Sequence, residues 1–137
     1  MQRTLTILKP DIVRAGDAGA VIGMIEAAGF RIRAAKMIHL SREAASRFYD
    51  VHRERPFYDS LVSFMTESPV IVMTLESDDA IGRLRKLMGA TDPAAAEEGT
   101  IRKKHGTNIE RNAIHGSDAA ETAAFEISYF FNRLEIV

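Results

Sequence analysis

The sequence contains no cysteine among its 137 residues. Without a thiol, the chain has no disulfide, no thiolate metal site and no cysteine nucleophile. Neither sign of charge dominates, because 18 lysines and arginines nearly balance 19 acidic residues and leave a formal net charge of −1. This balance excludes a global attraction to nucleic acid or to an anionic membrane.

Long hydrophobic runs are missing as well. No apolar run approaches the ~20 residues that a helix needs to span a bilayer. The N-terminal residues 1–11 are polar, and Lys9 and Pro10 interrupt them too early for a signal peptide. A cytoplasmic protein without a membrane partner is therefore expected. The length and the 46% of hydrophobic residues fit one compact domain, residues 1–137.

Common phosphate-binding and zinc-binding motifs are also absent. No Gly-Lys dipeptide occurs, so the chain has no P-loop, and residues 16–23, GDAGAVIG, do not match G-x-G-x-x-G. No pair of histidines has the His-x-x-x-His spacing of a catalytic zinc site. A phosphate-handling enzyme built from this sequence would therefore need cationic side chains in place of a glycine loop.

Hydrophobic periodicity predicts an alternation of strands and helices. Strands are expected at residues 3–8, 30–38 and 69–76, with a further strand-like segment at 128–131. Helices are expected at residues 19–28, 41–52, 57–67, 78–88 and 118–127. In the second strand, Phe30, Ile32 and Ala34 are expected to share one face. The order predicts an α/β (α+β) fold, a ferredoxin-like sandwich in which helices cover a mostly antiparallel four-stranded sheet.

Residues 89–116 show no clear period. A segment of that length without regular structure is uncommon in a compact domain and usually indicates function or disorder. Its cations Arg102, Lys103, Lys104 and Arg111, together with Lys9 and Arg85, are expected to supply positive charge for a phosphoryl group.

Three polar residues lie at the edges of apolar helix faces. Arg85 borders the apolar stripe of the helix at 78–88, where it either extends along the core edge or points into a cleft. Tyr49 either packs in the core or contacts a ligand. For Glu126 the simplest interpretation is an exposed carboxylate.

One histidine has distinctive neighbours. His115 precedes Gly116, Ser117 and Asp118 in the segment NAIHGSD, residues 112–118. Histidine is mostly neutral at pH 7, so an imidazole here is available as a nucleophile or base. Gly116 allows close approach or a positive φ, and Ser117 or Asp118 can cap the last helix, whose N-terminus favours an anion. The alternative is an ordinary loop histidine ahead of a helix cap. His39, His52 and His105 lack such surroundings and are expected to be structural or exposed.

Six short motifs occur in order along the chain. They are ILKPD (7–11), ERPFYDSLVSFM (54–65), LMGATDP (87–93), GTIR (99–102), NAIHGSD (112–118) and EISYFF (126–131). In these motifs the chain resembles the nucleoside diphosphate kinase family over essentially its whole length. Each motif is weak alone, whereas six in order and at the family spacing are specific.

The resemblance implies a phosphotransferase. The family transfers the γ-phosphoryl group of a nucleoside triphosphate, mainly ATP, to nucleoside diphosphates by a ping-pong mechanism. By this resemblance His115 is the nucleophile and becomes a phosphohistidine, while Glu126 and Ser117 orient its imidazole. Mg²⁺ is expected to arrive with the nucleotide rather than in a protein cage.

The resemblance also assigns the nucleotide contacts. Four residues match family positions around the transferred phosphate and the ribose: Lys9, Tyr49, Arg102 and Asn112. Arg85 and Thr91 match those that hold the β-phosphate. Phe57 is expected to stack on the base with Leu61 packed near it, and because every base has a π-face, broad base specificity is expected.

The resemblance leaves assembly and alternatives open. Family members form homo-oligomers, tetramers or hexamers built from dimers. Many relatives carry Ala-Asp and an aromatic residue where this chain has residues 103–105, Lys-Lys-His, so subunit contacts of that loop are an open question. Three other functions compete: a nucleotide-binding member without turnover, a phosphohistidine relay protein, and a nucleic-acid-binding module using residues 102–104 with Phe130 and Phe131. The balanced charge argues against nucleic acid as the main partner.

Overall fold

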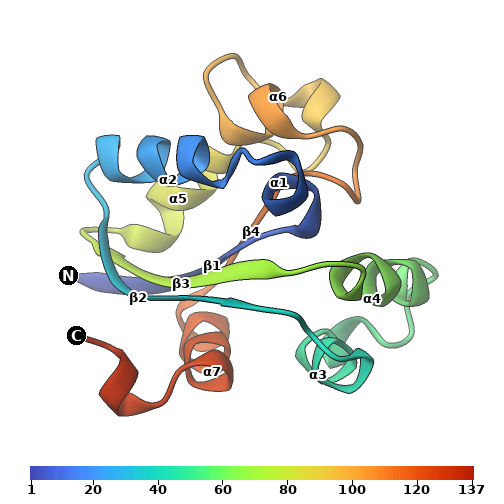
Figure 1. Ribbon diagram of the computed structural model, residues 1–137. Coiled ribbons are helices and arrows are strands. Elements are labelled where there is room, and N and C mark those ends of the chain that lie inside the picture. Colours follow the sequence, from blue (N-terminus) through green and yellow to red (C-terminus); the bar gives the residue numbers. More distant parts are fainter.

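A four-stranded antiparallel sheet lies at the centre of the computed structural model, which describes residues 1–137 (Figure 1). Its strands are β1 (Gln2–Leu8), β2 (Arg31–Ile38), β3 (Val70–Ser77) and β4 (Ile114–Gly116). They are arranged in the order β2-β3-β1-β4, and every neighbouring pair is antiparallel. The central strands β1 and β3 are buried along nearly their whole length, which explains their continuous β-branched and apolar character.

Seven helices connect and cover the strands. They are α1 (Pro10–Ala15), α2 (Ala18–Ala27), α3 (Arg42–Phe48), α4 (Tyr58–Thr66), α5 (Ala80–Met88), α6 (Ile101–His105) and α7 (Ala120–Phe130). Short 3₁₀ turns occupy Asp50–His52, Pro93–Ala95 and Arg133–Glu135. Ser41 caps α3 as expected, because its hydroxyl accepts the N–H of Ala44 at 3.1 Å. None of these helices has the length and apolar character needed to cross a bilayer.

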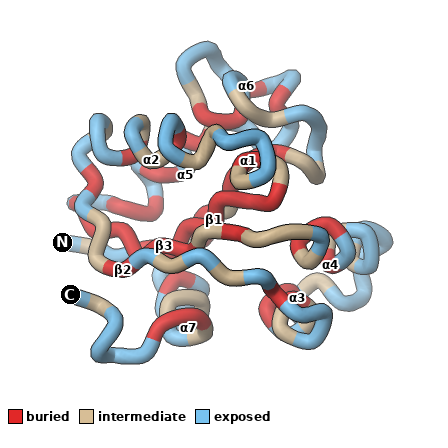
Figure 2. Tube along the Cα trace, in the orientation of Figure 1, coloured by how far each residue is buried: buried red, intermediate tan, exposed pale blue.

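The sheet separates two hydrophobic cores. On one face, α2 and α5 pack on side chains that include Leu8, Met73 and Leu75. On the other face, α3, α4 and α7 pack around Leu5 and Ile7. Figure 2 shows that buried residues follow the strands and the inner sides of these helices, while their outer sides are exposed. The predicted ferredoxin-like α+β architecture is therefore confirmed.

The predicted strand at 128–131 is wrong. Residues up to Phe130 continue α7, and the fourth strand is instead β4, which contains His115. The aromatic residues of this segment suit a strand locally, but Phe130 lies seven residues after Ala123 and both are buried on the same side of the helix. Strand β4 has only three residues, which is too short for alternation to be recognised.

The prediction that Ala34 shares a strand face with Phe30 and Ile32 is wrong, because β2 contains a bulge. The register of β2 against β3 shifts between Ile32 and Ala34. Because one extra residue reverses the side to which the following side chains point, Phe30 and Ile32 pack in one core and Ala34 packs in the other. The extra residue, Arg33, donates two hydrogen bonds to Glu76 at 3.0 and 2.8 Å.

Candidate active site

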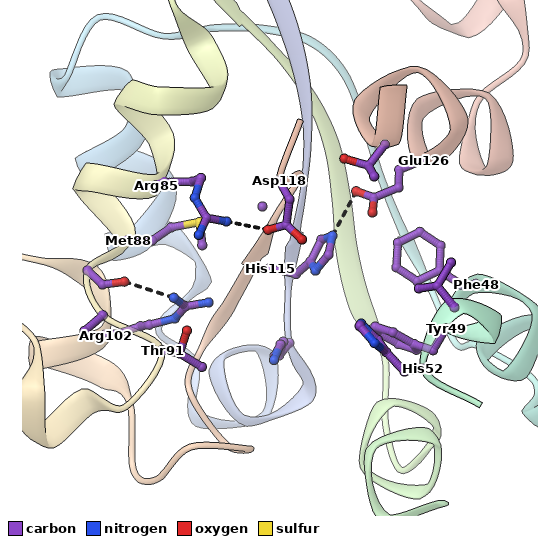
Figure 3. Close-up of a pocket in the computed structure, with 16 residues that line it drawn as sticks. Phe48, Tyr49, His52, Arg85, Met88, Thr91, Arg102, His115, Asp118 and Glu126 are labelled. Carbon is purple, nitrogen blue, oxygen red and sulfur yellow. Dashed lines mark hydrogen bonds and ion pairs between the residues drawn. The ribbon is translucent and has the colours of Figure 1, made fainter. Parts of the chain in front are cut away.

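His115 lies on the edge strand β4, beside β1, at the centre of a cavity (Figure 3). Its Nε2 is 2.9 Å from Oε1 of Glu126 on α7. The hydroxyl of Ser117 donates to the same carboxylate oxygen at 2.7 Å. A carboxylate can only accept, so this geometry favours the tautomer with the proton on Nε2 and leaves Nδ1 as the ring nitrogen with a free lone pair.

The backbone before His115 is tightly constrained. Ala113 has a φ of 77°, and the N–H of Ile114 donates across it to the carbonyl of Asn112 at 2.9 Å. This i to i+2 bond is a γ-turn in the strained left-handed region. The N–H of Ala113 donates to the carboxylate of Asp11 at 3.0 Å, and its carbonyl accepts the N–H of Lys9 at 2.9 Å. Segments 9–11 and 112–114 are thus locked together.

Lys9 is a buried cation in the cavity wall. Its Nζ donates to Oδ1 of Asn112 at 2.7 Å. The amide nitrogen of Asn112 donates in turn to the carbonyls of Thr91 at 3.0 Å and Ile109 at 3.1 Å. Burial, reinforced by the charge of Arg102, lowers the pKa of Lys9 to about 8. A buried ammonium with one neutral acceptor lacks an anionic partner, which an anionic ligand would provide.

Arg102 on α6 is the second buried cation. It donates to the carbonyls of Gly89 at 3.0 Å and Ile114 at 2.9 Å, while its Nε has no partner in the chain. Burial, followed by the charge of Arg85, lowers the pKa of Arg102 to about 10. Arg85 on α5 lines the cavity that contains His115, and its guanidinium pairs with the carboxylate of Asp118, as Figure 3 shows.

Two adjoining hollows form the site. The larger, about 480 Å³, contains His115 and Glu126. The smaller, about 340 Å³, is lined by residues that include Phe57, Leu61, Ile109, Glu110 and Asn112. The two hollows share the wall residues Lys9, Tyr49, His52, Thr91, Arg102 and His115. The hydroxyl of Tyr49 is buried without a partner, and burial raises the pKa of Tyr49 above its usual range.

The structure gathers the predicted site residues from across the chain. Among the residues to which the family resemblance assigns a role, all line one hollow or the other except Ser117, which lies behind Glu126 and accepts the N–H of Leu5 at 3.2 Å. The position of Gly116 also has a physical reason. A Cβ there would lie 2.6 Å from Sδ of Met88, so glycine lets β4 pack closely on α5 without displacing the Met88 side chain.

One expectation for the surroundings of His115 is wrong. Neither Ser117 nor Asp118 caps α7, because their side chains bind Glu126 and Arg85 instead. The N–H of Ala119 bonds the hydroxyl of Thr122 at 2.9 Å at the start of α7.

Three of the expected phosphate cations do not line the site. Lys103 and Lys104 are exposed on α6 and line neither hollow. Arg111 faces Glu67, to which it donates two hydrogen bonds at 2.7 and 3.1 Å.

Sequence reasoning missed other wall residues. His52 lines both hollows and stacks on Tyr49, with ring centroids 6.4 Å apart. Its position three residues after Tyr49 is the signal in the sequence, because residues three apart in a helical turn lie on the same side. Ile109 and Glu110 have no signal in sequence, because their position depends on how the long loop folds back.

Two aromatic residues argue against the nucleic-acid-binding alternative. Phe130 and Phe131, which a nucleic-acid-binding module would use for stacking, are 7% and 5% exposed. Because both rings are packed in the core, they present no stacking surface to bases.

Comparisons with known proteins agree with this geometry. A family model described as nucleoside diphosphate kinase matches residues 2–136. The chain is 60% identical to a nucleoside diphosphate kinase of Trichlorobacter lovleyi and 57% identical to one of Nitratidesulfovibrio vulgaris. Both matches cover 100% of this chain and 99% of the relative.

Solved structures show the same fold. The nucleoside diphosphate kinase of Aquifex aeolicus superposes with a TM-score of 0.98 at 45% identity, covering 99% of both chains. That of Halobacterium salinarum, solved in complex with CDP, superposes with a TM-score of 0.96 at 39% identity, covering 99% of this chain and 91% of the other.

Proposed function

The chain belongs to the nucleoside diphosphate kinase family, and on that premise we propose that it transfers the γ-phosphoryl group of nucleoside triphosphates, mainly ATP, through a phosphohistidine at His115. The observation that carries this proposal is the contact between Nε2 of His115 and Glu126 at 2.9 Å inside a cavity walled by buried cations. Because Glu126 holds the imidazole of His115 at Nε2, the other ring nitrogen, Nδ1, is available to attack the substrate.

The reaction divides into two transfers. In the first, the lone pair on Nδ1 of His115 attacks the γ-phosphorus, an N–P bond forms, and the bond to the β-γ bridging oxygen breaks, so that a nucleoside diphosphate leaves. In the second, an oxygen on the β-phosphate of another diphosphate attacks the phosphohistidine and the N–P bond breaks. Glu126 accepts the Nε2–H throughout and stabilises the positive charge that the ring gains, and Ser117 holds the carboxylate in place.

Buried cations supply the electrostatics that a glycine loop provides elsewhere. We assign Lys9 and Arg102 to the transferred phosphate, together with the unpaired hydroxyl of Tyr49. Arg85 and Thr91, which line the larger hollow, are assigned to the β-phosphate. Because these donors are fixed before substrate binds, little reorganisation is needed as charge develops.

The smaller hollow, referred to below as the base cleft, is assigned to the nucleoside. Phe57, which is 47% exposed at the start of α4, offers a ring face on which a base can stack. Leu61 packs beside it, and Asn112 lies between the cleft and Lys9, where it is suited to contact the ribose.

Mg²⁺ is the proposed cofactor, carried by the phosphates of the nucleotide. The structure contains no group of three or more acidic, histidine or cysteine side chains that could hold a metal ion. Both carboxylates of the larger hollow have partners in the chain. Glu126 contacts His115 and Ser117, and Asp118 pairs with Arg85. Such a donor set supports a Mg²⁺ bound by phosphate oxygens and water, where it would neutralise phosphate charge.

We further propose a single domain over residues 1–137 and a cytoplasmic homo-oligomer built from dimers, a tetramer or a hexamer. Both cores share one sheet, which supports one folding unit. Strand β2 lies at the edge of that sheet and carries Met37, 58% exposed, so its backbone is a template for pairing with a second copy. Light scattering during gel filtration tests the assembly, and a monomeric mass would contradict it.

Labelling with γ-³²P-ATP and Mg²⁺ tests the proposed mechanism. The protein is expected to acquire an acid-labile phosphate, which moves to a nucleoside diphosphate added afterwards. His115→Ala should abolish labelling and retain nucleotide binding, whereas His39→Ala, remote from the cavity, should label normally. Labelling that persists without His115 would move the nucleophile elsewhere.

A further inference from the structure

Glu110 lines the base cleft, and its carboxylate has no hydrogen-bond or ion-pair partner in the chain. The residue follows Ile109, and both line the cleft that Phe57 and Leu61 line from the start of α4. Only the backbone of Glu110 is engaged in a hydrogen bond, and no ion pair involves its side chain. Burial lowers the pKa of Lys9, and the negative charge of Glu110 acts in the opposite direction, as expected for a carboxylate close to the cavity.

The segment that carries Glu110 is held rigidly. The side-chain oxygen of Asn108 accepts the N–H groups of Glu110 at 3.0 Å and Arg111 at 2.8 Å. The N–H of Thr107 donates to the carbonyl of Arg111 at 2.7 Å and closes the turn. Local bonds of this kind fix the backbone from which the Glu110 side chain projects.

Arg111 anchors the same turn to α4. Its guanidinium donates two hydrogen bonds to Glu67 at 2.7 and 3.1 Å and lies 4.6 Å from the centroid of the Phe64 ring. The base cleft therefore has a preformed wall, and ligand binding does not have to order it.

A free carboxylate distinguishes bases by their hydrogen-bond donors. It has two acceptor oxygens and no donor, so it pairs best with two adjacent N–H groups. Among the common bases only guanine offers such a pair, at N1 and the 2-amino group. Adenine and cytosine place a ring acceptor beside their amino group, and uracil and thymine place two carbonyls beside a single N–H.

We propose that Glu110 makes this enzyme favour guanine nucleotides, by accepting hydrogen bonds from N1–H and the 2-amino group of a base stacked on Phe57. This inference rests on the proposed function, because it takes the cleft at Phe57 as the base site. Stacking tolerates every base, and the carboxylate adds a preference at the edge of the base.

Discharge of the phosphoenzyme by GDP and by inosine diphosphate isolates this contact, because the two differ only in the 2-amino group. The phosphorylated protein is freed of nucleotide, mixed rapidly with each diphosphate, and the second-order rate constants are compared. Loss of one hydrogen bond to a charged group predicts that GDP reacts roughly tenfold faster in the wild type.

Two variants and one control complete the experiment. Glu110→Ala should bring the GDP to inosine diphosphate ratio to about one, because no acceptor remains. Glu110→Gln keeps the shape of the side chain but has one acceptor, so the ratio should fall to roughly threefold or less. Glu98→Gln changes an exposed carboxylate of the same long loop that lies outside both hollows, and should keep the wild-type ratio.

The outcomes separate this inference from the proposed function. A wild-type ratio near one, or a high ratio that persists in Glu110→Ala, overturns the assignment of Glu110. Equal acceleration of both diphosphates in Glu110→Ala also overturns it, because that pattern indicates simple repulsion between the carboxylate and the phosphates. If neither diphosphate discharges the wild-type phosphoenzyme, the proposed kinase mechanism itself fails.

Discussion

At the scale of single residues, the site depends on charges held out of water. Lys9 and Arg102 are 7% and 8% exposed, and both have lowered pKa values because burial disfavours their charged forms. Neither has an acidic partner among its hydrogen bonds. A buried cation without an acidic partner destabilises the folded protein. A bound phosphate offsets this cost, so the site has affinity for anions because Lys9 and Arg102 lack acidic partners.

The lowered pKa of Lys9 predicts a pH dependence. Lys9 is cationic below its pKa of about 8 and neutral above it, so kcat/KM for a nucleoside triphosphate should fall as pH rises through about 8. The fall in kcat should occur at a higher pH than the fall in kcat/KM, because the negative charge of bound phosphate stabilises the protonated form of Lys9. Lys9→Met should lower kcat/KM by roughly 10- to 100-fold at pH 7, and the fall in kcat/KM near pH 8 should disappear in this variant. Profiles from pH 6 to 10 measure this, and a wild-type profile flat through pH 8 contradicts it.

The same pKa shift affects stability with a definite sign. An unfolded chain titrates Lys9 at 10.5, whereas the folded chain titrates it at about 8. Between these values the unfolded state binds more protons, so the contribution of Lys9 to folding becomes more favourable as pH rises from about 8 toward 10.5. At pH 7 the full penalty of the buried ammonium is present.

At the scale of elements, the site forms where the end of α5 meets the start of α6. Gly89 ends α5 with a φ of 87°, and its carbonyl accepts the guanidinium of Arg102. A Cβ at Gly89 would lie 2.6 Å from the hydroxyl and 2.8 Å from Cβ of Thr100, the residue that caps α6. The two helices can therefore approach closely enough to orient Arg102 only if residue 89 is glycine.

Gly89→Ala should destabilise the protein and weaken nucleotide binding together. Strain at the positive φ costs about 1–3 kcal/mol, and overlap with Thr100 adds roughly another 1–3 kcal/mol. Urea unfolding measures the loss, and calorimetry measures nucleotide affinity.

Gly23→Ala is the matched control for that variant. A Cβ at Gly23, within α2, meets nothing within 4 Å, so this change should stabilise the protein by roughly 0.5–1 kcal/mol and leave binding unchanged. Equal effects of the two substitutions would refute the role given to Gly89.

Elements with strong periods were predictable, and short ones were not. Most of the expected strands and helices, such as 69–76 and 78–88, lie within two residues of their expected bounds, whereas α3 ends four residues before the expected end at 52 and α7 continues three residues past the expected end at 127. Residues 89–116 contain α6 and β4, of five and three residues, which are too short to establish a period. Tertiary contacts rather than local propensity maintain such elements.

At the scale of the whole molecule, the cavity joins segments from both cores. Lys9 follows β1, Tyr49 ends α3 and Glu126 lies on α7, while Arg102 and His115 come from α6 and β4 within residues 89–116. No single element contains the site, so any ligand that fills it ties the two helical layers to the sheet. Binding is therefore linked to global stability.

Nucleotide should raise the melting temperature of the protein, and the stabilisation should grow with the logarithm of the nucleotide concentration relative to its Kd. At a nucleoside diphosphate concentration 100 times its Kd, the free energy of unfolding should rise by about 2.7 kcal/mol. His115→Ala should keep most of this rise, because the imidazole acts in transfer, whereas Arg102→Ala should lose most of it. Differential scanning calorimetry distinguishes them, and a rise in Arg102→Ala equal to that of the wild type would contradict the assigned phosphate site.

The sequence by itself determined the family, the fold class and many of the residues that line the site. These follow from motif order and from hydrophobic periods, which are properties of neighbours along the chain. Only the tertiary structure decided that His115 lies on an edge strand, that Ser117 supports Glu126 instead of capping a helix, and that Arg111 faces Glu67. It also placed His52 and Glu110 in the walls of the site. The physical reason is that hydrogen-bond partners and burial depend on segments distant in sequence, which meet only when the sheet and its two cores assemble.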